Sequence, residues 1–179
     1  MMTDTLLVIS GCGIPPWSCR GARQNLTPDV DAQMERDVNG SLKDIPLPAS
    51  FQKLRTSISC EDVAAPAFGD LVYGQQIVIS CIQERGIPIT LAAGVGSATL
   101  PRDAVAGTGR AVAATGAQAS ATLSGTGNRT AAVDFGDGSL SGQAWIYYRP
   151  ILTCRVENWT CDFDEWAATY NWSLDAREI

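Results

Sequence analysis

The clearest pattern in the chain is the alternation of apolar and polar side chains, which predicts β-strands. From Leu54 to Cys60, small or apolar residues alternate with polar ones, as expected for a half-buried strand. The run TLLVIS (5–10) predicts the first strand, and QQIVISCIQE (75–84) predicts a central strand because it is apolar on both faces. Near the C-terminus, VENWTCDFDEW and ATYNWSLDA predict two antiparallel strands.

Turn signals separate these strands. Pro15 and Pro16 cannot lie inside a strand, so the stretch after Gly11 is expected to be a long turn. Asn39-Gly40 predicts a hairpin turn, preceded in DAQMERDV by one or two helical turns. Asp137-Gly138, within DFGDG, predicts another turn rather than a calcium loop, because further oxygen ligands and a bidentate glutamate are lacking.

Residues 86–133 differ from the rest in composition. They are rich in Gly, Ala, Ser and Thr and have few large side chains. We therefore expect an inserted extended arm or hairpin that neighbouring subunits order. The remainder predicts a β-sandwich or β-barrel core, so that residues 1–179 form a single all-β domain carrying this arm.

Composition excludes several kinds of chemistry. The chain has no histidine, which rules out Ser-His-Asp and Cys-His hydrolase mechanisms. Its net charge is −6, and Lys43 and Lys53 are its only lysines, so tight binding to the DNA backbone is not expected. An acidic surface would instead repel DNA and let it pass. The glycine-rich segments match neither a Walker loop nor a dinucleotide fingerprint, and we predict no cofactor.

Six cysteines occur without a C-x-x-C motif, so no zinc or other metal site is expected. Cys60, Cys81 and Cys154 lie in strand-like patterns and are predicted to be small buried hydrophobes. The spacings Cys12–Cys19 and Cys154–Cys161 would each permit a small loop, but a reducing cytoplasm argues against disulfides. The N-terminus lacks the basic region of a signal peptide, and no apolar run is long enough to span a membrane, so we expect no membrane insertion.

Two groups of residues are candidate sites. Asp162, Asp164 and Glu165 lie among aromatic residues, and the alternation with Phe163 predicts a solvated acidic face. Paired carboxylates beside tryptophans also leave open a glycosidase, or a sugar-binding surface that uses Trp159, Trp166 or Trp172.

The second group lies in the opening segment GCGIPPWSCRGARQ (11–24). We predict that Pro15, Pro16 and Trp17 form a rigid contact wedge. Arg20 and Arg23 are expected to pair with carboxylates across a subunit boundary.

Several phrases together resemble small structural proteins from the tail modules of long-tailed, siphovirus-like bacteriophages. They are IPPWSCRGARQNLTP, LRTSISCEDVAAPAF, YGQQIVISCIQE and YYRPILTCRVENWTCDFDEWAATYNWSLDARE, within residues 5–85 and 145–179. The resemblance implies rings built from β-sandwich or β-barrel cores. It implies a non-enzymatic tail-tube, tail-tip or baseplate subunit that conducts the genome. Such a subunit would contact its own copies and other tail proteins, in the host cytoplasm before assembly and then in the virion.

Two other classes remain open. A capsid decoration protein or carbohydrate-binding module would also be β-rich with aromatic residues at one end. A carboxylate hydrolase is the third class, and it would require Asp164 or Glu165 for activity.

Overall fold

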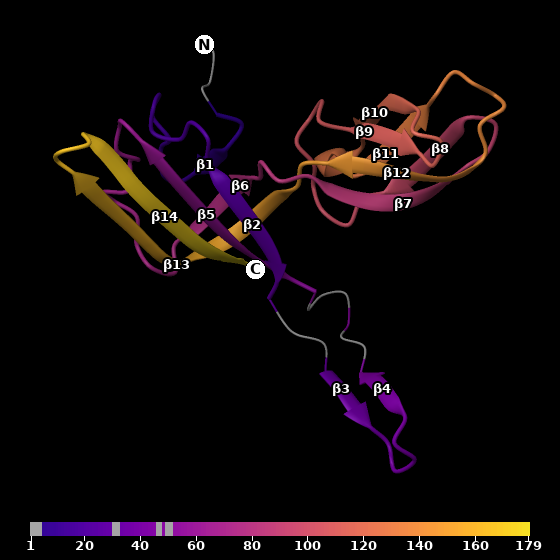
Figure 1. Cartoon of the computed structure of the whole chain (residues 1–179), viewed down its shortest axis with the longest axis horizontal. Coiled ribbons are helices and arrows are strands. Elements are labelled where there is room, and N and C mark those ends of the chain that lie inside the picture. Colours follow the sequence, from indigo (N-terminus) through magenta and orange to yellow (C-terminus); the bar gives the residue numbers. More distant parts are fainter. Residues whose placement is uncertain (1–4, 30–32, 46–47, 49–51) are drawn as a thin grey trace. The chain divides into compact units, whose positions relative to one another are not determined.

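Nearly all regular structure in the chain is β. The computed structural model describes residues 5–29, 33–45, 48 and 52–179, which contain fourteen strands (Figure 1). One short 3-10 helix, η2 (Thr126–Asn128), and no α-helix occurs in these ranges. The predicted all-β class is confirmed.

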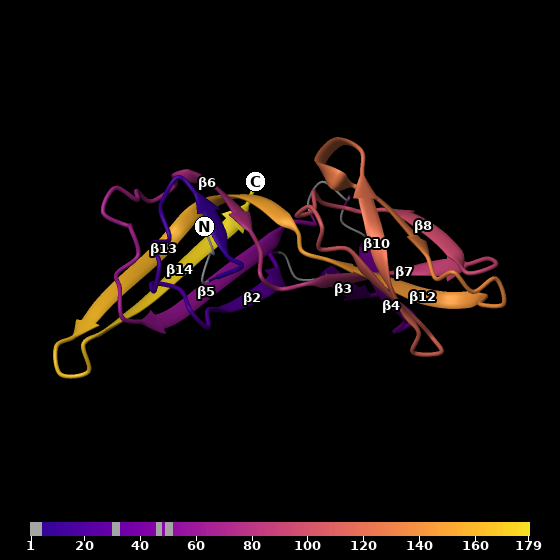
Figure 2. The ribbon, with the colours of Figure 1, turned by 90° about the horizontal axis from the view of Figure 1, so that it is seen from above.

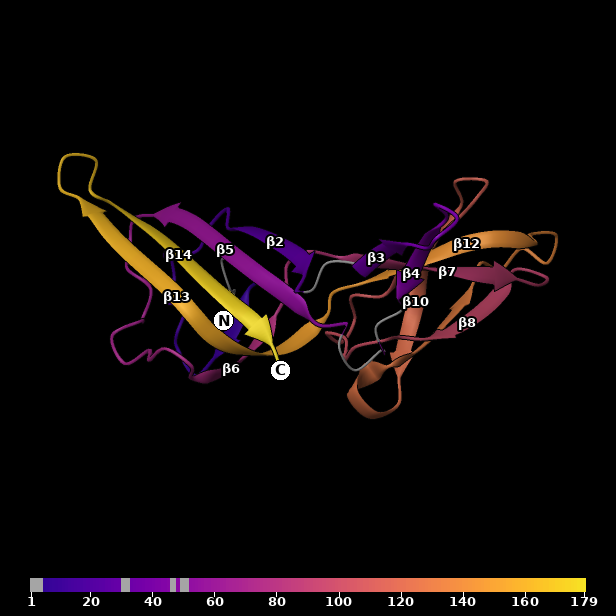
Figure 3. The ribbon, with the colours of Figure 1, turned by 90° about the horizontal axis from the view of Figure 1, so that it is seen from below.

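The first sheet has six strands in the order β1-β6-β13-β14-β5-β2 and forms a half-barrel. Its strands are β1 (Val8–Ser10), β2 (Arg23–Pro28), β5 (Leu54–Asp62), β6 (Gln76–Ser80), β13 (Ile151–Asp164) and β14 (Thr169–Glu178). Figure 3 shows β13, β14, β5 and β2 side by side. The predicted C-terminal strand pair is confirmed as the antiparallel hairpin β13–β14, and β6 is a central strand as predicted.

The second sheet also has six strands, in the order β7-β12-β9-β10-β11-β8. Its strands are β7 (Arg85–Leu91), β8 (Val95–Thr99), β9 (Arg110–Ala113), β10 (Gln118–Ser124), β11 (Thr130–Asp134) and β12 (Gly142–Tyr148). The two end strands, β7 and β8, lie near each other, so this sheet nearly closes into a barrel (Figure 2).

A two-stranded sheet of β3 (Gln33–Arg36) and β4 (Leu42–Ile45) is separate from both. Its turn carries the predicted Asn39-Gly40 pair, with Gly40 at φ 80°. The Asp37 carboxylate accepts the backbone N–H groups of Asn39 and Ser41 at 2.9 and 3.0 Å. The helical turn predicted in DAQMERDV is wrong, since residues 33–36 are a strand; its first two residues, 31–32, lie outside the described part.

The chain divides into two compact units. Unit 1 comprises residues 1–5, 10–77 and 153–179, and unit 2 comprises residues 6–9 and 78–152. This differs from the single domain with an extended arm that composition predicts. Residues 86–133 supply strands β7 to β11 of unit 2, apart from the first residue of β7 and the last residue of β11.

The core of unit 2 explains how a segment of small residues forms such a unit. Buried alanines from β9, β10, β11 and β12 line its interior, among them Ala111, Ala131 and Ala144, each fully buried. Larger side chains from the same cluster fill the space between them, including the fully buried Ile146 and Tyr148 of β12. Small residues on some strands therefore pack against large residues on others, which gives the close packing of a normal protein interior.

The core of unit 1 follows the predicted alternation. Along β5 the residues are alternately buried and exposed over all nine positions, starting with Leu54. The inner face meets Trp172 of β14, which is 2% exposed. Phe68 packs edge-on against Trp172, with ring centroids 5.3 Å apart, and also against Trp159 at 5.8 Å. These aromatic contacts fix the side of the sheet that faces the core and leave the other side polar.

Candidate functional site

The opening segment places an exposed tryptophan on a tight turn. Ser18 donates its backbone N–H and its hydroxyl to the carbonyl of Pro15, at 3.3 and 2.7 Å. Pro16 and Trp17 are the central residues of this turn, and Trp17 has φ 61°. This conformation favours glycine, because the Cβ of other residues meets the backbone. The Trp17 side chain nevertheless remains 57% exposed.

Two anchors hold this turn against the sheet of unit 1. The indole N–H of Trp172 donates to the carbonyl of Ser18 at 2.7 Å. Two residues later, Arg20 binds Asp62 through its backbone N–H and through Nη2, both at 2.7 Å. Arg20 is thus paired within its own subunit rather than left free for the carboxylate of a neighbour.

The contacts of the Arg20–Asp62 pair stabilise the ionised form of the Asp62 carboxyl group. Asp62 is 5% exposed, and hydrogen bonds from Arg20 are the main reason that its pKa falls to about 2 from the usual 3.8. The N–H of Val63 adds a further hydrogen bond at 2.8 Å. Since every one of these contacts favours the ionised carboxylate, Asp62 acts as a fixed anion that holds the opening segment.

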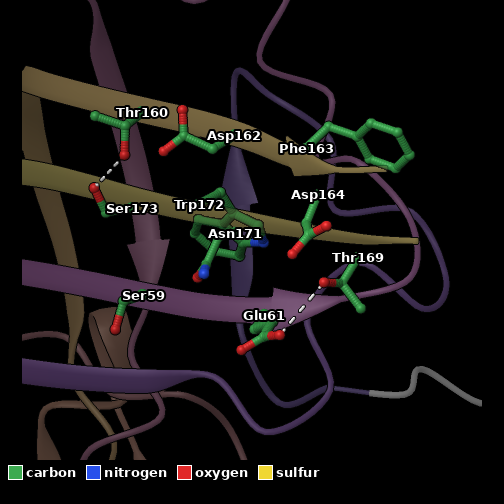
Figure 4. A pocket seen from close by; sticks show the side chains of 10 residues that line it. All are labelled: Ser59, Glu61, Thr160, Asp162, Phe163, Asp164, Thr169, Asn171, Trp172 and Ser173. Atoms are coloured by element: carbon green, nitrogen blue, oxygen red, sulfur yellow. Dashed lines mark hydrogen bonds between the residues drawn. The ribbon is translucent and has the colours of Figure 1, made fainter. Parts of the chain in front are cut away.

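The predicted acidic residues lie on the outer face of the same sheet. Asp162 on β13 pairs across the sheet with Asn171 on β14, which pairs with Glu61 on β5. Asp164 follows at the end of β13, beside Thr169. Figure 4 shows this polar face, with Trp172 on the opposite, buried side of the sheet.

A groove of about 310 Å³ runs over these side chains. Its floor includes a hydrogen bond between the hydroxyls of Thr160 and Ser173 at 2.8 Å, and Phe163 lies among its lining residues (Figure 4). A second groove of about 320 Å³ shares Ser59, Glu61 and Asn171 with the first, so the two adjoin. Hydroxyl, amide and carboxylate groups therefore form a continuous polar surface.

Arg23 lies at the far side of this surface. It pairs in register with Ser59 on β5 and lines the second groove. The two predicted arginines thus have different environments: Arg20 holds Asp62, whereas Arg23 is exposed near Glu61. The contribution of Glu61 was not predicted, although the alternation of residues 54–60, carried one step further, places it on the outer face.

The hairpin turn at residues 164–169 gives the other predicted residues specific roles. The Asp164 carboxylate accepts the backbone N–H groups of Trp166 and Ala167, at 2.9 and 3.1 Å, and so shapes the turn. Glu165 lies in this turn and is exposed, outside the groove lining. Trp166 is 99% exposed. Because the Asp164 carboxylate accepts two backbone hydrogen bonds, its role here is to stabilise the turn.

The three tryptophans proposed for sugar stacking differ in exposure. Trp172 is buried, and Trp159 is half-buried, with its indole N–H donating to the carbonyl of Leu71 at 3.2 Å. Only Trp166 of these three presents its ring to solvent. Trp159 and Trp172 instead face the core of unit 1.

All six cysteines are free thiols in this structure. Cys60, Cys81 and Cys154 are buried, as predicted. Cys19 is also buried, at 2% exposure, while Cys12 is half-buried and Cys161 exposed. Burial raises the pKa of the Cys19 thiol, and it raises that of Cys60 to about 12 with further contributions from Cys19 and Asp62.

The polar face contains groups for hydrogen bonding and ion pairing. Within the described ranges, no three His, Cys, Asp or Glu side chains are grouped so that they could hold a metal ion. Nor does that part of the chain contain a helix of the length and apolarity needed to cross a membrane. A scan against family models and a search of curated proteins gave no match to the chain.

Proposed function

We propose that the chain is a non-enzymatic structural subunit of a bacteriophage tail. Copies would assemble into a ring of the tail tube, tail tip or baseplate, together with other tail proteins. The quoted phrases that resemble tail proteins fall mainly in unit 1, at the opening segment, β5, β6, β13 and β14. The structure supports this proposal through features that the isolated subunit does not need.

Trp17 is the observation that carries the proposal. Its φ of 61° is unfavourable for a residue other than glycine, and more than half of its side chain is in solvent. Neither backbone preference nor core packing of the subunit therefore explains a tryptophan here. A large exposed aromatic side chain on a turn fixed by Pro16 is typical of a residue that anchors an interface.

The β3–β4 hairpin supports the same interpretation. It is a two-stranded sheet with Val38 fully exposed in its turn. A hairpin of two strands is only marginally stable in water unless it packs against something else. Docking on a neighbouring subunit would supply that packing, as in assemblies whose subunits exchange contacts through arms.

The charge of the chain fits passage of DNA through such a ring. The net charge is −6, and the outer face of unit 1 carries Glu61, Asp162 and Asp164. Acidic surfaces repel the DNA backbone, which allows the polymer to move without adhering.

Light scattering followed by negative-stain microscopy tests the proposal. We expect the purified protein to form rings or stacked tubes as its concentration rises, and we expect Trp17→Gly to weaken this association at least tenfold. Val95→Ser is the matched control, because Val95 is a similarly exposed apolar residue of unit 2, at 51%. The proposal would be contradicted if the protein stayed monomeric at all concentrations, or if both variants self-associated as strongly as the wild type does.

Carbohydrate binding is a second candidate, favoured by the groove of Figure 4. Asp162, Asn171 and Glu61 form a row of planar polar groups suited to sugar hydroxyls, and Phe163 supplies an aromatic ring at the groove. A glycan screen with wild type and Asn171→Ala tests this. Binding that Asn171→Ala abolishes supports this candidate, whereas no binding to any glycan removes it.

A further inference from the structure

Three consecutive residues of the opening segment align with three residues on the inner face of the sheet. The anchors on either side of Cys19 are the Ser18 carbonyl, bound by Trp172, and the Arg20 backbone N–H, bound by Asp62. Cys19 lies between these two fixed points and therefore has little freedom to move.

The residue opposite Cys19 is Cys60 of β5. The Cys60 thiol donates to the carbonyl of Arg20, the residue after Cys19, at 3.4 Å, and the Cys19 and Cys60 side chains lie close enough together that each affects the pKa of the other. Thr5 donates its hydroxyl to the Cys19 sulfur at 3.7 Å. Both thiols are buried, at 2% and 6% exposure.

We propose that Cys19 and Cys60 are a dithiol pair that two-electron oxidation converts into an intrachain disulfide. This bond would join the opening segment covalently to β5, and it would fix the turn that carries Trp17. The pairing depends on the fold, because the partners are about 40 residues apart, and it is independent of the function proposed above.

The pairings that the sequence spacing suggests are less suitable. Cys154 and Cys161 lie on the same strand, β13, and seven residues of extended chain separate their Cα atoms by roughly 23 Å. A disulfide requires a Cα separation of about 4.4–6.8 Å, so this pair cannot form. Cys12 would compete with Cys60 for Cys19, but the anchors at Ser18 and Arg20 hold Cys19 against Cys60.

Exchange with a small-molecule disulfide such as oxidised glutathione completes the reaction. The thiolate of one cysteine attacks glutathione disulfide, which releases one glutathione thiolate and leaves a mixed disulfide. The second cysteine, as thiolate, then attacks the protein sulfur of that mixed disulfide and displaces the other glutathione. One glutathione disulfide is reduced to two thiols, and the two protein thiols lose two protons in total.

Burial makes this reaction slow in the folded protein, because thiolate is the reacting form and both thiols have a raised pKa. The experiment therefore refolds the reduced protein from urea in a glutathione redox buffer, so that exchange accompanies folding. Peptide mass spectrometry then maps the crosslinks. We expect one dominant crosslink, between Cys19 and Cys60, and a melting temperature about 10 °C above that of the reduced protein.

Two variants accompany the wild type. The double variant Cys12→Ser/Cys161→Ser removes the two more accessible thiols and should keep the crosslink and the melting shift. Cys60→Ser should lose both. Native protein incubated for days in the same buffer gives a second measurement that does not depend on refolding. A dominant crosslink elsewhere, or Cys19 and Cys60 still reduced under both conditions, would overturn the proposal.

Discussion

The Asp62 carboxylate accepts both the backbone N–H and the Nη2 of Arg20, each at 2.7 Å, across 42 positions of sequence. Asp62 has a pKa of about 2 in the folded protein, below its usual 3.8. A lowered native pKa means that the ionised carboxylate stabilises the fold above about pH 5. This stabilisation is lost as the pH falls toward 2.

We therefore predict that Asp62→Asn lowers the free energy of unfolding by about 1 to 2 kcal/mol at pH 7. The value is limited because Arg20 is half-exposed and the pair is partly screened. Urea unfolding between pH 7 and pH 2 should show a smaller loss of stability with acid for this variant than for the wild type. Asp70→Asn, at an exposed carboxylate, is the control and should behave like the wild type. Equal acid sensitivity of Asp62→Asn and wild type would contradict this account.

A β-bulge on β13 inserts a glutamate among three arginines. Arg177 on β14 pairs in register with both Arg55 and Arg155, and the register of β13 shifts between Val156 and Asn158. The intervening Glu157 lies 2.6 Å from the Nε of Arg177 and 3.4 Å from Nη2 of Arg55. The bulge thus supplies an anion where like charges would otherwise face each other.

Glu157→Gln is expected to destabilise the protein by about 1 kcal/mol in low salt, because Arg55 and Arg177 lose this carboxylate, although Arg177 keeps Asp29 at 3.3 Å. Since exposed charges are screened by ions, the loss should shrink in 1 M NaCl. Urea titrations at the two salt concentrations measure this difference. Glu165→Gln, in the exposed hairpin turn, should cause no comparable loss. A salt-independent effect of Glu157→Gln would indicate a packing role instead.

Local pattern predicted the strands well where one face is buried. The alternation from Leu54 to Cys60 and the paired C-terminal segments required only the two-residue period of a strand. The short segment before Asn39-Gly40 was mispredicted as helical, because four residues carry too little periodicity to separate a helical turn from a strand.

Long-range packing was less accessible from sequence. The composition of residues 86–133 does not indicate a core, because the large side chains that complete it come partly from β12, outside the segment. The site shows the same limit. Asp162 and Asp164 follow from strand alternation, but Glu61 joins them only through the strand order β13-β14-β5. Arg20 was assigned to a neighbour because nothing local indicates Asp62 as its partner.

Gly109 illustrates how packing, rather than ligand binding, accounts for a glycine-rich stretch. A Cβ at this position would lie 2.5 Å from the carbonyl oxygen of Ala121 and 3.0 Å from the side chain of Leu123. Because the first contact is with backbone, the sheet itself would have to move. We predict that Gly109→Ala destabilises the protein by about 2 to 3 kcal/mol.

Thermal and urea unfolding test this prediction with Gly138→Ala as the matched control. A Cβ at Gly138 meets no atom within 4 Å, so that variant should keep wild-type stability or gain slightly. If the two variants unfold alike, the close approach of Gly109 to β10 does not constrain this part of unit 2.

The variant Trp17→Gly tests whether Trp17 stabilises the fold of its own subunit or serves contact with another subunit. Glycine relieves the unfavourable φ of 61°, worth about 1 to 2 kcal/mol, and costs about 0.5 to 1 kcal/mol in chain entropy. The remaining net gain is offset by the loss of the packing that the partly buried Trp17 side chain makes. We therefore expect the free energy of unfolding, measured at concentrations where the protein is monomeric, to change by less than about 1 kcal/mol. Trp172→Ala, which removes a buried indole and its bond to Ser18, should cost about 3 to 5 kcal/mol. A loss of similar size in Trp17→Gly would mean that Trp17 serves the fold of its own subunit, and its assignment to a subunit interface would fail.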